Sequence, residues 1–189
     1  ALPVGAYAYS QGLEYAVERG WARDEAGAGE WILGLLNHTM RRLDLPIFAR
    51  LHQAWRAKDD EAARRWNARL HASREAAELQ REDHHLGTAL ARLLSDLGIV
   101  EAERWRNARH VCFATLFGLA AVKWEIPLPE AATGYAWAWT ENQVTAATRL
   151  IPLGQTASQR LLVAAGPAIA AAVAEGLTLT DEEIGAAAP

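Results

Sequence analysis

The chain has 189 residues and is rich in Ala and Leu, with few of the β-branched residues that favour strands. Its formal net charge of −4 provides no broad basic surface, which excludes nucleic acid and anionic membrane surfaces as expected partners. The single cysteine, Cys112, excludes an internal disulfide, and we find no signal peptide and no uncharged apolar run approaching 18 residues. We therefore expect one soluble domain, spanning residues 1–189, in the cytoplasm.

Capping residues and helically spaced apolar residues predict the elements of the first third of the chain. Ser10 is placed to cap a helix that ends near Gly20, and Asp24 to cap a second helix that ends near Leu43. Asp44 is placed to cap a third helix, whose inner face includes Phe48, Leu51 and Trp55. These signals predict three consecutive helices with short connections.

The longest helical segment runs from Asp59 or Asp60 to about Leu97. Its two apolar stripes do not join smoothly, and we expect a kink or a short break between residues 83 and 87. The same patterns predict three more helices, over about residues 103–124, 129–151 and 153–176, the last interrupted at Gly166-Pro167. Together they predict an all-α fold, an irregular bundle of about eight helices.

Both ends of the chain resemble cuts rather than natural termini, since it starts without methionine and ends in an Ala-rich stretch. Thr180-Asp-Glu-Glu183 has the pattern of a capping box, but the helix that it would begin is short. We expect the chain to fray beyond this point, because it has little apolar surface with which to pack.

One pattern suggests metal chemistry. Five side chains that can bind a divalent cation recur at spacings of four, three, four and three, which would place them on one face of a continuous helix: His71, Glu75, Glu78, Glu82 and His85. Arg74 and Arg81 are placed to pair with these glutamates. Three interpretations stay open: a solvated face laced with ion pairs, a face that docks a partner, and a weak, transient metal site. A metal-dependent helical-bundle enzyme is the alternative function that this stripe suggests.

Other catalytic patterns find little support. Glu82 and His85 form the only Glu-x-x-His pair, whereas a helical di-iron site needs two such pairs. Cys112 lies in an apolar stretch, no serine lies in a nucleophile-elbow pattern, and there is no phosphate-binding P-loop. We therefore expect a binding protein and not an enzyme, with no tightly bound cofactor and no firm metal ligand.

Four motifs stand in a fixed order along the chain. The first is the lead segment from Leu2 to Glu14, and the second is Asp-Leu-Pro at residues 44–46. The third is Arg-Glu-x-x-Glu-Leu at residues 74–79, and the fourth is Pro-Leu-Gly-Gln-Thr-x-x-Gln at residues 152–159. In this order and spacing they resemble the UreF-type urease accessory proteins over nearly the whole chain. Ala6 and Ala8 depart from the Gly and Ser usual in that family.

The resemblance implies an all-α chaperone for nickel insertion that has no enzymatic activity. Such proteins form homodimers, bind the UreD-type (or UreH-type) accessory protein and recruit the UreG-type GTPase, and the assembly delivers nickel to apo-urease. Nickel would then meet this chain only in transit. The eight tryptophans are consistent with a homodimer, because aromatic residues are enriched at interfaces.

The family motifs also supply the candidate contact residues. The side chains expected at partner interfaces are Tyr7, Tyr9, Ser10, Gln11, Glu14, Arg74, Glu75, Glu78, Arg149, Gln155, Thr156 and Gln159. Gln155, Thr156 and Gln159 lie at the start of a predicted helix. Thr156 alone could cap the free N–H groups of that helix, so capping does not explain the two glutamines.

Overall fold

The computed structural model describes residues 12–185 and confirms the all-α prediction, because no strand occurs in that range. The elements in chain order are α1 (Leu13–Glu18), α2 (Glu25–Leu35), the π-helix η2 (Leu36–Asp44), α3 (Leu45–Arg56), α4 (Asp60–Ala72), α5 (Ala77–Asp96), α6 (Val100–Glu103), α7 (Phe113–Lys123), α8 (Leu128–Leu150) and α9 (Gln155–Gly176). Two of the predicted caps are confirmed: the carboxylates of Asp24 and Asp59 accept hydrogen bonds from the N–H groups of Gly27 and Ala62.

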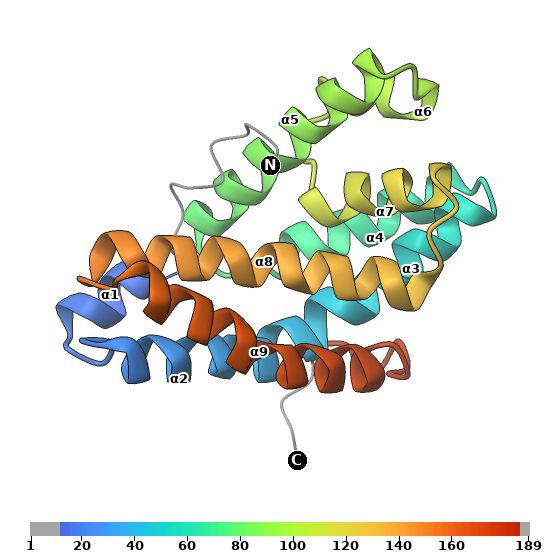
Figure 1. Ribbon diagram of the computed structural model, residues 1–189. Coiled ribbons are helices and arrows are strands. Elements are labelled where there is room, and N and C mark those ends of the chain that lie inside the picture. The colour runs from blue at the N-terminus through green and yellow to red at the C-terminus, as the bar shows by residue number, and fades with distance from the viewer. Residues whose placement is uncertain (1–11, 186–189) are drawn as a thin grey trace.

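Helix α8 runs through the middle of the molecule (Figure 1). It packs against α9 on one side and against α3 and α7 on the other, while α5 packs on α7. The buried apolar side chains form two clusters, one around Phe48 and one around Trp55, and both contact Phe113 and Phe117. The two clusters therefore form a continuous core, in which each fully buried large apolar side chain contributes roughly 1.5–3 kcal/mol.

The predicted helix start at Asp44 is wrong. The chain stays helical from α2 through η2 into α3, and Asp44 has helical backbone angles and caps nothing. Its carboxylate instead accepts two hydrogen bonds from Arg74, thirty residues further along the chain. The local pattern predicted that the Asp44 side chain caps a helix, but in the structure it forms a long-range ion pair.

The predicted break between residues 83 and 87 is also wrong, since α5 is continuous there. The break lies at residues 73–76, between α4 and α5. Gly87 has a packing role: a Cβ at this position would lie 2.5 Å from the carbonyl oxygen of Val111. The glycine thus lets the chain before α7 approach α5 closely.

The helix predicted over residues 103–124 begins only at Phe113. Residues 104–112 form a loop that the buried side chain of Asn67 holds in place. The Asn67 amide donates to the carbonyl oxygen of His110 (3.0 Å), and its oxygen accepts from the N–H of Cys112 (2.9 Å) and from the hydroxyl of Thr115 (2.8 Å). The loop therefore has side-chain partners for its backbone groups and needs no helix.

The interruption predicted at Gly166-Pro167 does not occur, because α9 continues through Pro167. The carbonyl that loses its partner belongs to Val163, which is exposed and can bond to water. Among the described helices, α9 alone is long and apolar enough to cross a membrane, contrary to the expectation from sequence. Its inner face, including Ile169 and Ala172, is nevertheless buried in the core of the bundle.

The chain beyond α9 is packed as far as residue 185, so the fraying expected beyond Glu183 is wrong for Ile184 and Gly185. Ile184 is buried in the main core cluster, and the N–H of Gly185 donates to the carbonyl of Arg42 (2.9 Å). Arg50 donates to the Leu179 carbonyl oxygen (2.6 Å) and pairs with Asp181 (2.8 Å). The capping box is confirmed on one side, since the Glu183 carboxylate accepts from the N–H of Thr180.

Candidate functional site

A buried ion-pair network lies where five parts of the chain meet. Arg74, in the break between α4 and α5, donates to both carboxylate oxygens of Asp44 at 2.5 and 3.1 Å. Its Nε donates to Asp83 on α5 at 3.3 Å. The three side chains are only 12%, 4% and 10% exposed. Such a bidentate guanidinium–carboxylate contact fixes the orientation of both partners.

Two further hydrogen bonds extend this network to α7 and α8. The N–H of Phe113, at the start of α7, donates to Asp83 (2.7 Å), and the hydroxyl of Tyr135 on α8 donates to Asp44 (3.3 Å). Burial alone would lower the pKa of Arg74, but the negative charges of Asp44 and Asp83 outweigh burial and raise that pKa well above its usual value. Burial raises the pKa of Tyr135, and the charge of Asp44 raises it further. Arg74 therefore stays charged and Tyr135 neutral.

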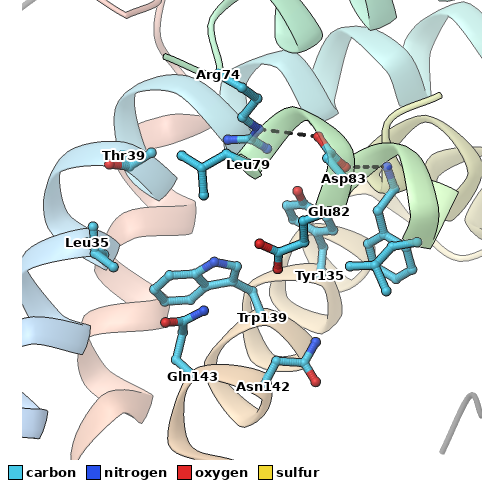
Figure 2. Close-up of a pocket in the computed structure, with 12 residues that line it drawn as sticks. Leu35, Thr39, Arg74, Leu79, Glu82, Asp83, Tyr135, Trp139, Asn142 and Gln143 are labelled. Atoms are coloured by element: carbon cyan, nitrogen blue, oxygen red, sulfur yellow. Dashed lines mark hydrogen bonds and ion pairs between the residues drawn. The ribbon is translucent and has the colours of Figure 1, made fainter. Parts of the chain in front are cut away.

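A pocket of about 120 Å³ opens beside the network (Figure 2). It is lined by side chains from α2, η2, the 73–76 segment, α5, α7 and α8: Leu35, Thr39, Arg74, Leu79, Glu82, Asp83, Leu86, Phe113, Tyr135, Trp139, Asn142 and Gln143. We call this the Glu82 pocket. Its walls combine apolar and aromatic side chains with polar and charged ones, as a binding site needs for burial and for specificity.

Glu82 is the most unusual side chain of the pocket. It is 7% exposed, and within the described residues its carboxyl accepts no hydrogen bond. Burial, with the adjacent charge of Asp83, raises its pKa to about 7, although the charge of Arg74 acts in the opposite direction. Glu82 therefore changes its protonation state close to neutral pH.

Gln143 supplies a buried acceptor that is unsatisfied. The residue is 1% exposed, and its amide oxygen has no hydrogen-bond partner within the described residues. A buried acceptor without a donor costs roughly 1–3 kcal/mol. Figure 2 shows Glu82, Trp139 and Gln143 among the side chains that line this pocket. The pocket thus presents two acceptors beside an aromatic surface.

The predicted metal-binding stripe is not assembled, because the helix that should carry it is broken. His71 lies on α4, where its ring stacks on His110 with centroids 4.0 Å apart, and Glu75 lies in the break. On α5, Glu78 and His85 are exposed while Glu82 is buried. Within the described part of the chain, no group of three His, Cys, Asp or Glu residues is placed to hold a metal ion.

The break has a physical cause. Arg74 was expected to pair with neighbouring glutamates, but its guanidinium turns inward to Asp44 and Asp83. The Gln80 side chain then donates to the Arg74 carbonyl oxygen (3.0 Å), and the Ser73 hydroxyl donates to that of Arg69 (2.9 Å). These bonds replace the helical ones at the break between α4 and α5.

The candidate partner residues fall into separate places. Tyr7, Tyr9, Ser10 and Gln11 lie outside the described residues. The other exposed candidates occupy α1, the 73–76 segment, the start of α5, the end of α8 and the start of α9: Glu14, Glu75, Glu78, Arg149, Gln155, Thr156 and Gln159. None of these lines the Glu82 pocket. Arg74 alone among the candidates does so, and it is buried in the ion-pair network.

The expected capping at the start of α9 is wrong in its detail. The N-cap residue is Gly154, and no side chain caps this helix. Gln155, Thr156 and Gln159 are exposed there, and Arg160 next to them pairs with Glu25 of α2 (2.6 Å). The polar side chains of this motif therefore face solvent, where a partner could reach them.

Sequence reasoning missed most of the pocket. Asp44 had been given a capping role, and Asp83, Tyr135, Trp139 and Gln143 had no functional role. The available signal was that Asp44 and Arg74 each begin one of the four ordered motifs. Their pairing across thirty residues follows from the fold and not from local spacing.

Comparison with known proteins shows that the chain is similar to one protein family. The family model UreF matches residues 22–166, more than half of the chain. A urease accessory protein UreF from Alkalilimnicola ehrlichii is 50% identical over 188 residues, which cover 100% of this chain and 82% of the relative. Proteins of the same name from Teredinibacter turnerae and Chromohalobacter salexigens are 48% and 45% identical, again over 100% of this chain, and over 85% and 82% of their own lengths.

Proposed function

Because the chain belongs to the UreF family of urease accessory proteins, we propose that it acts in urease maturation as a non-enzymatic scaffold. In this proposal it binds the UreD-type (UreH-type) accessory protein and recruits or regulates the UreG-type GTPase. The resulting assembly, in the cytoplasm, inserts nickel into apo-urease. The observation that carries the proposal is similarity over the full length of the chain to relatives named as urease accessory proteins.

The chemistry of the described side chains supports a scaffold over an enzyme. Cys112 is fully buried, and burial raises the pKa of its thiol, so it does not provide a reactive thiolate. Its thiol contacts the carbonyl oxygen of Asn67 (3.5 Å) in the interior. The polar groups of the Glu82 pocket suit binding, since they include no nucleophile paired with a base.

Nickel would meet this chain in transit only. The described part of the chain has no group of three His, Cys, Asp or Glu residues placed to hold a metal ion. A resident metal site normally supplies at least three protein ligands. We therefore propose that nickel is held by other members of the assembly and not by a stable site on this protein.

We further propose that the protein is a homodimer. Three tryptophans on different elements, Trp21, Trp124 and Trp137, are 62%, 58% and 39% exposed. Aromatic residues are enriched in protein interfaces and are costly to leave in water. Multi-angle light scattering at tens of micromolar should give twice the chain mass, and a monomer mass would contradict the dimer.

Co-expression with a UreD-type protein and a UreG-type GTPase tests the scaffold role. We expect all three to elute together in size-exclusion chromatography. Replacing exposed Glu75 and Glu78 with Gln should weaken this complex without changing the melting temperature, because neither side chain is buried. Glu141→Gln, an exposed change on α8, is the matched control and should leave the complex intact.

Two results would count against the scaffold role. If the unmodified chain elutes separately from both partners, the scaffold role is contradicted. A loss of melting temperature in the Glu75/Glu78 variant would show that these side chains serve the fold and not a partner.

A further inference from the structure

The Glu82 pocket contains more buried negative charge than the described residues neutralise. Among the described residues that line it, Arg74 is the only cation, and its guanidinium is already held by Asp44 and Asp83. Glu82 adds a third carboxyl group that makes no hydrogen bond within the described residues. A buried carboxylate that lacks a partner is costly, so the pocket is suited to a second cation.

The unsatisfied acceptors define the shape of that cation. The amide oxygen of Gln143 is buried and has no donor, and the Glu82 carboxyl has no hydrogen bond from the described residues; both residues are more than nine-tenths buried. Both residues line the pocket, together with Trp139 (Figure 2). A guanidinium group has five N–H donors in a planar fork and stacks on aromatic rings, so it can bond to more than one acceptor at once.

The remaining walls suit the rest of an arginine side chain. Leu35, Leu79 and Leu86 offer apolar surface on which a methylene stem packs. A volume of about 120 Å³ is room for several water molecules, and therefore for a guanidinium group of four heavy atoms. A bare metal ion fits less well, because the described residues place no three suitable ligands together.

We propose that the Glu82 pocket binds the guanidinium group of an arginine side chain presented by a partner protein. The proposal rests on the proposed scaffold function, which supplies the partner. It gives that function a specific recognition site of the kind that dominates interface energetics, a buried arginine anchor.

Binding of a model arginine tests the pocket directly. The full chain is titrated with Nα-acetyl-arginine amide at pH 8 and followed by NMR, with Nα-acetyl-citrulline amide as the neutral, isosteric probe. We expect saturable binding of the arginine probe and at least tenfold weaker binding of citrulline. Glu82→Gln should weaken arginine binding at least tenfold, whereas Glu141→Gln, exposed on α8, should change it less than twofold.

The pH dependence provides a second readout. Several groups face Glu82: Glu78 and Asp83 from α5, Arg74 from the 73–76 segment, and Asp44 and Tyr135 around that arginine. With the pKa of Glu82 at about 7, the ionised fraction falls about tenfold between pH 8 and pH 6, and arginine affinity should fall with it. Affinity that does not change with pH would overturn the role of Glu82.

The remaining outcomes are decisive as well. Equal binding of both probes, or undiminished binding to a folded Glu82→Gln variant, overturns the proposal. If Glu82→Gln turns a dimer into a monomer, the arginine belongs to a second copy of the chain, and the assignment to a different protein is wrong. Failure of arginine binding in a chain that still supports urease activation rejects the pocket and leaves the scaffold function standing. Binding without urease activation rejects the function instead.

Discussion

Arg74 shows how one buried residue determines local structure. It joins the 73–76 segment to η2 through Asp44 and to α5 through Asp83. Asp83 in turn holds the first N–H of α7, and Asp44 accepts from Tyr135 on α8. Burying charges is expensive, but once they are buried, removing one partner leaves the others without compensation.

Arg74→Gln should therefore destabilise the protein by about 3–5 kcal/mol, the usual cost of breaking a buried ion pair. The matched control is Arg81→Gln, on the exposed face of α5, which should change the free energy of unfolding by no more than about 0.5 kcal/mol. Urea denaturation monitored by circular dichroism measures both. Equal stability of the two variants would show that the network contributes nothing to folding.

Glu82 should make stability depend on pH in a defined window. Its pKa is raised from 4.5 to about 7 in the folded protein, so folding favours the protonated form. The stability associated with that form is fully present below about pH 4.5 and is lost as pH rises through 7. From the linkage relation, the free energy of unfolding of the Glu82→Gln variant should exceed that of the unmodified chain by about 2–3 kcal/mol at pH 8 and by little at pH 4.5.

Urea denaturation of the two proteins across pH 4.5–8 measures this difference. Glu141→Gln serves as the control, because an exposed glutamate has no such burial cost. A difference between Glu82→Gln and the unmodified chain that is constant across the range would mean that folding does not shift the pKa of Glu82.

At the level of helices, the sequence predicted the elements better than their ends. Periodicity and caps located α2, α4, α8 and α9, because these signals depend on neighbouring residues. The boundaries that failed are those set by long-range contacts. Asp44 pairs with Arg74, and Asn67 holds the loop that precedes α7. Local spacing carries no information about either partner.

Gly87 tests the close approach of α5 to the chain before α7. A Cβ added there would meet backbone atoms of Val111 at 2.5 and 2.8 Å, so Gly87→Ala should destabilise by at least about 2 kcal/mol. Gly134→Ala, on the exposed side of α8 with its nearest neighbour at 3.9 Å, should instead stabilise by about 0.5–1 kcal/mol. Thermal denaturation of both variants checks the pair, and a neutral Gly87→Ala would show that the two segments are more loosely packed.

On the scale of the whole molecule, the fold class followed from composition, whereas the pocket did not. A chain rich in Ala and Leu without alternating patterns has few options besides a helical bundle. The Glu82 pocket gathers side chains from α2, α5, α7 and α8, which are up to about a hundred residues apart. The glutamates had been grouped on one exposed face, because a continuous helix was assumed where Arg74 breaks it.

The segment after α9 is expected to stabilise the bundle. Ile184 is buried, and the neighbouring N–H of Gly185 is bonded to Arg42. Ile184→Ala should lower the free energy of unfolding by about 2 kcal/mol and speed hydrogen exchange at the Gly185 amide. Glu182→Ala, a change at an exposed residue of the same segment, should do neither. Unchanged exchange at Gly185 in the Ile184 variant would mean that this segment is held by its arginine contacts alone.

Urease activation tests the central claim most directly. A urease operon from which the gene for its own UreF-type protein is deleted is expressed with nickel, with and without this chain in its full natural form. The account predicts that the chain restores urease activity and the nickel content of purified urease, and that the Glu75/Glu78 double Gln variant restores less than Glu141→Gln. Urease that stays nickel-free and inactive although the folded chain is present would contradict the account.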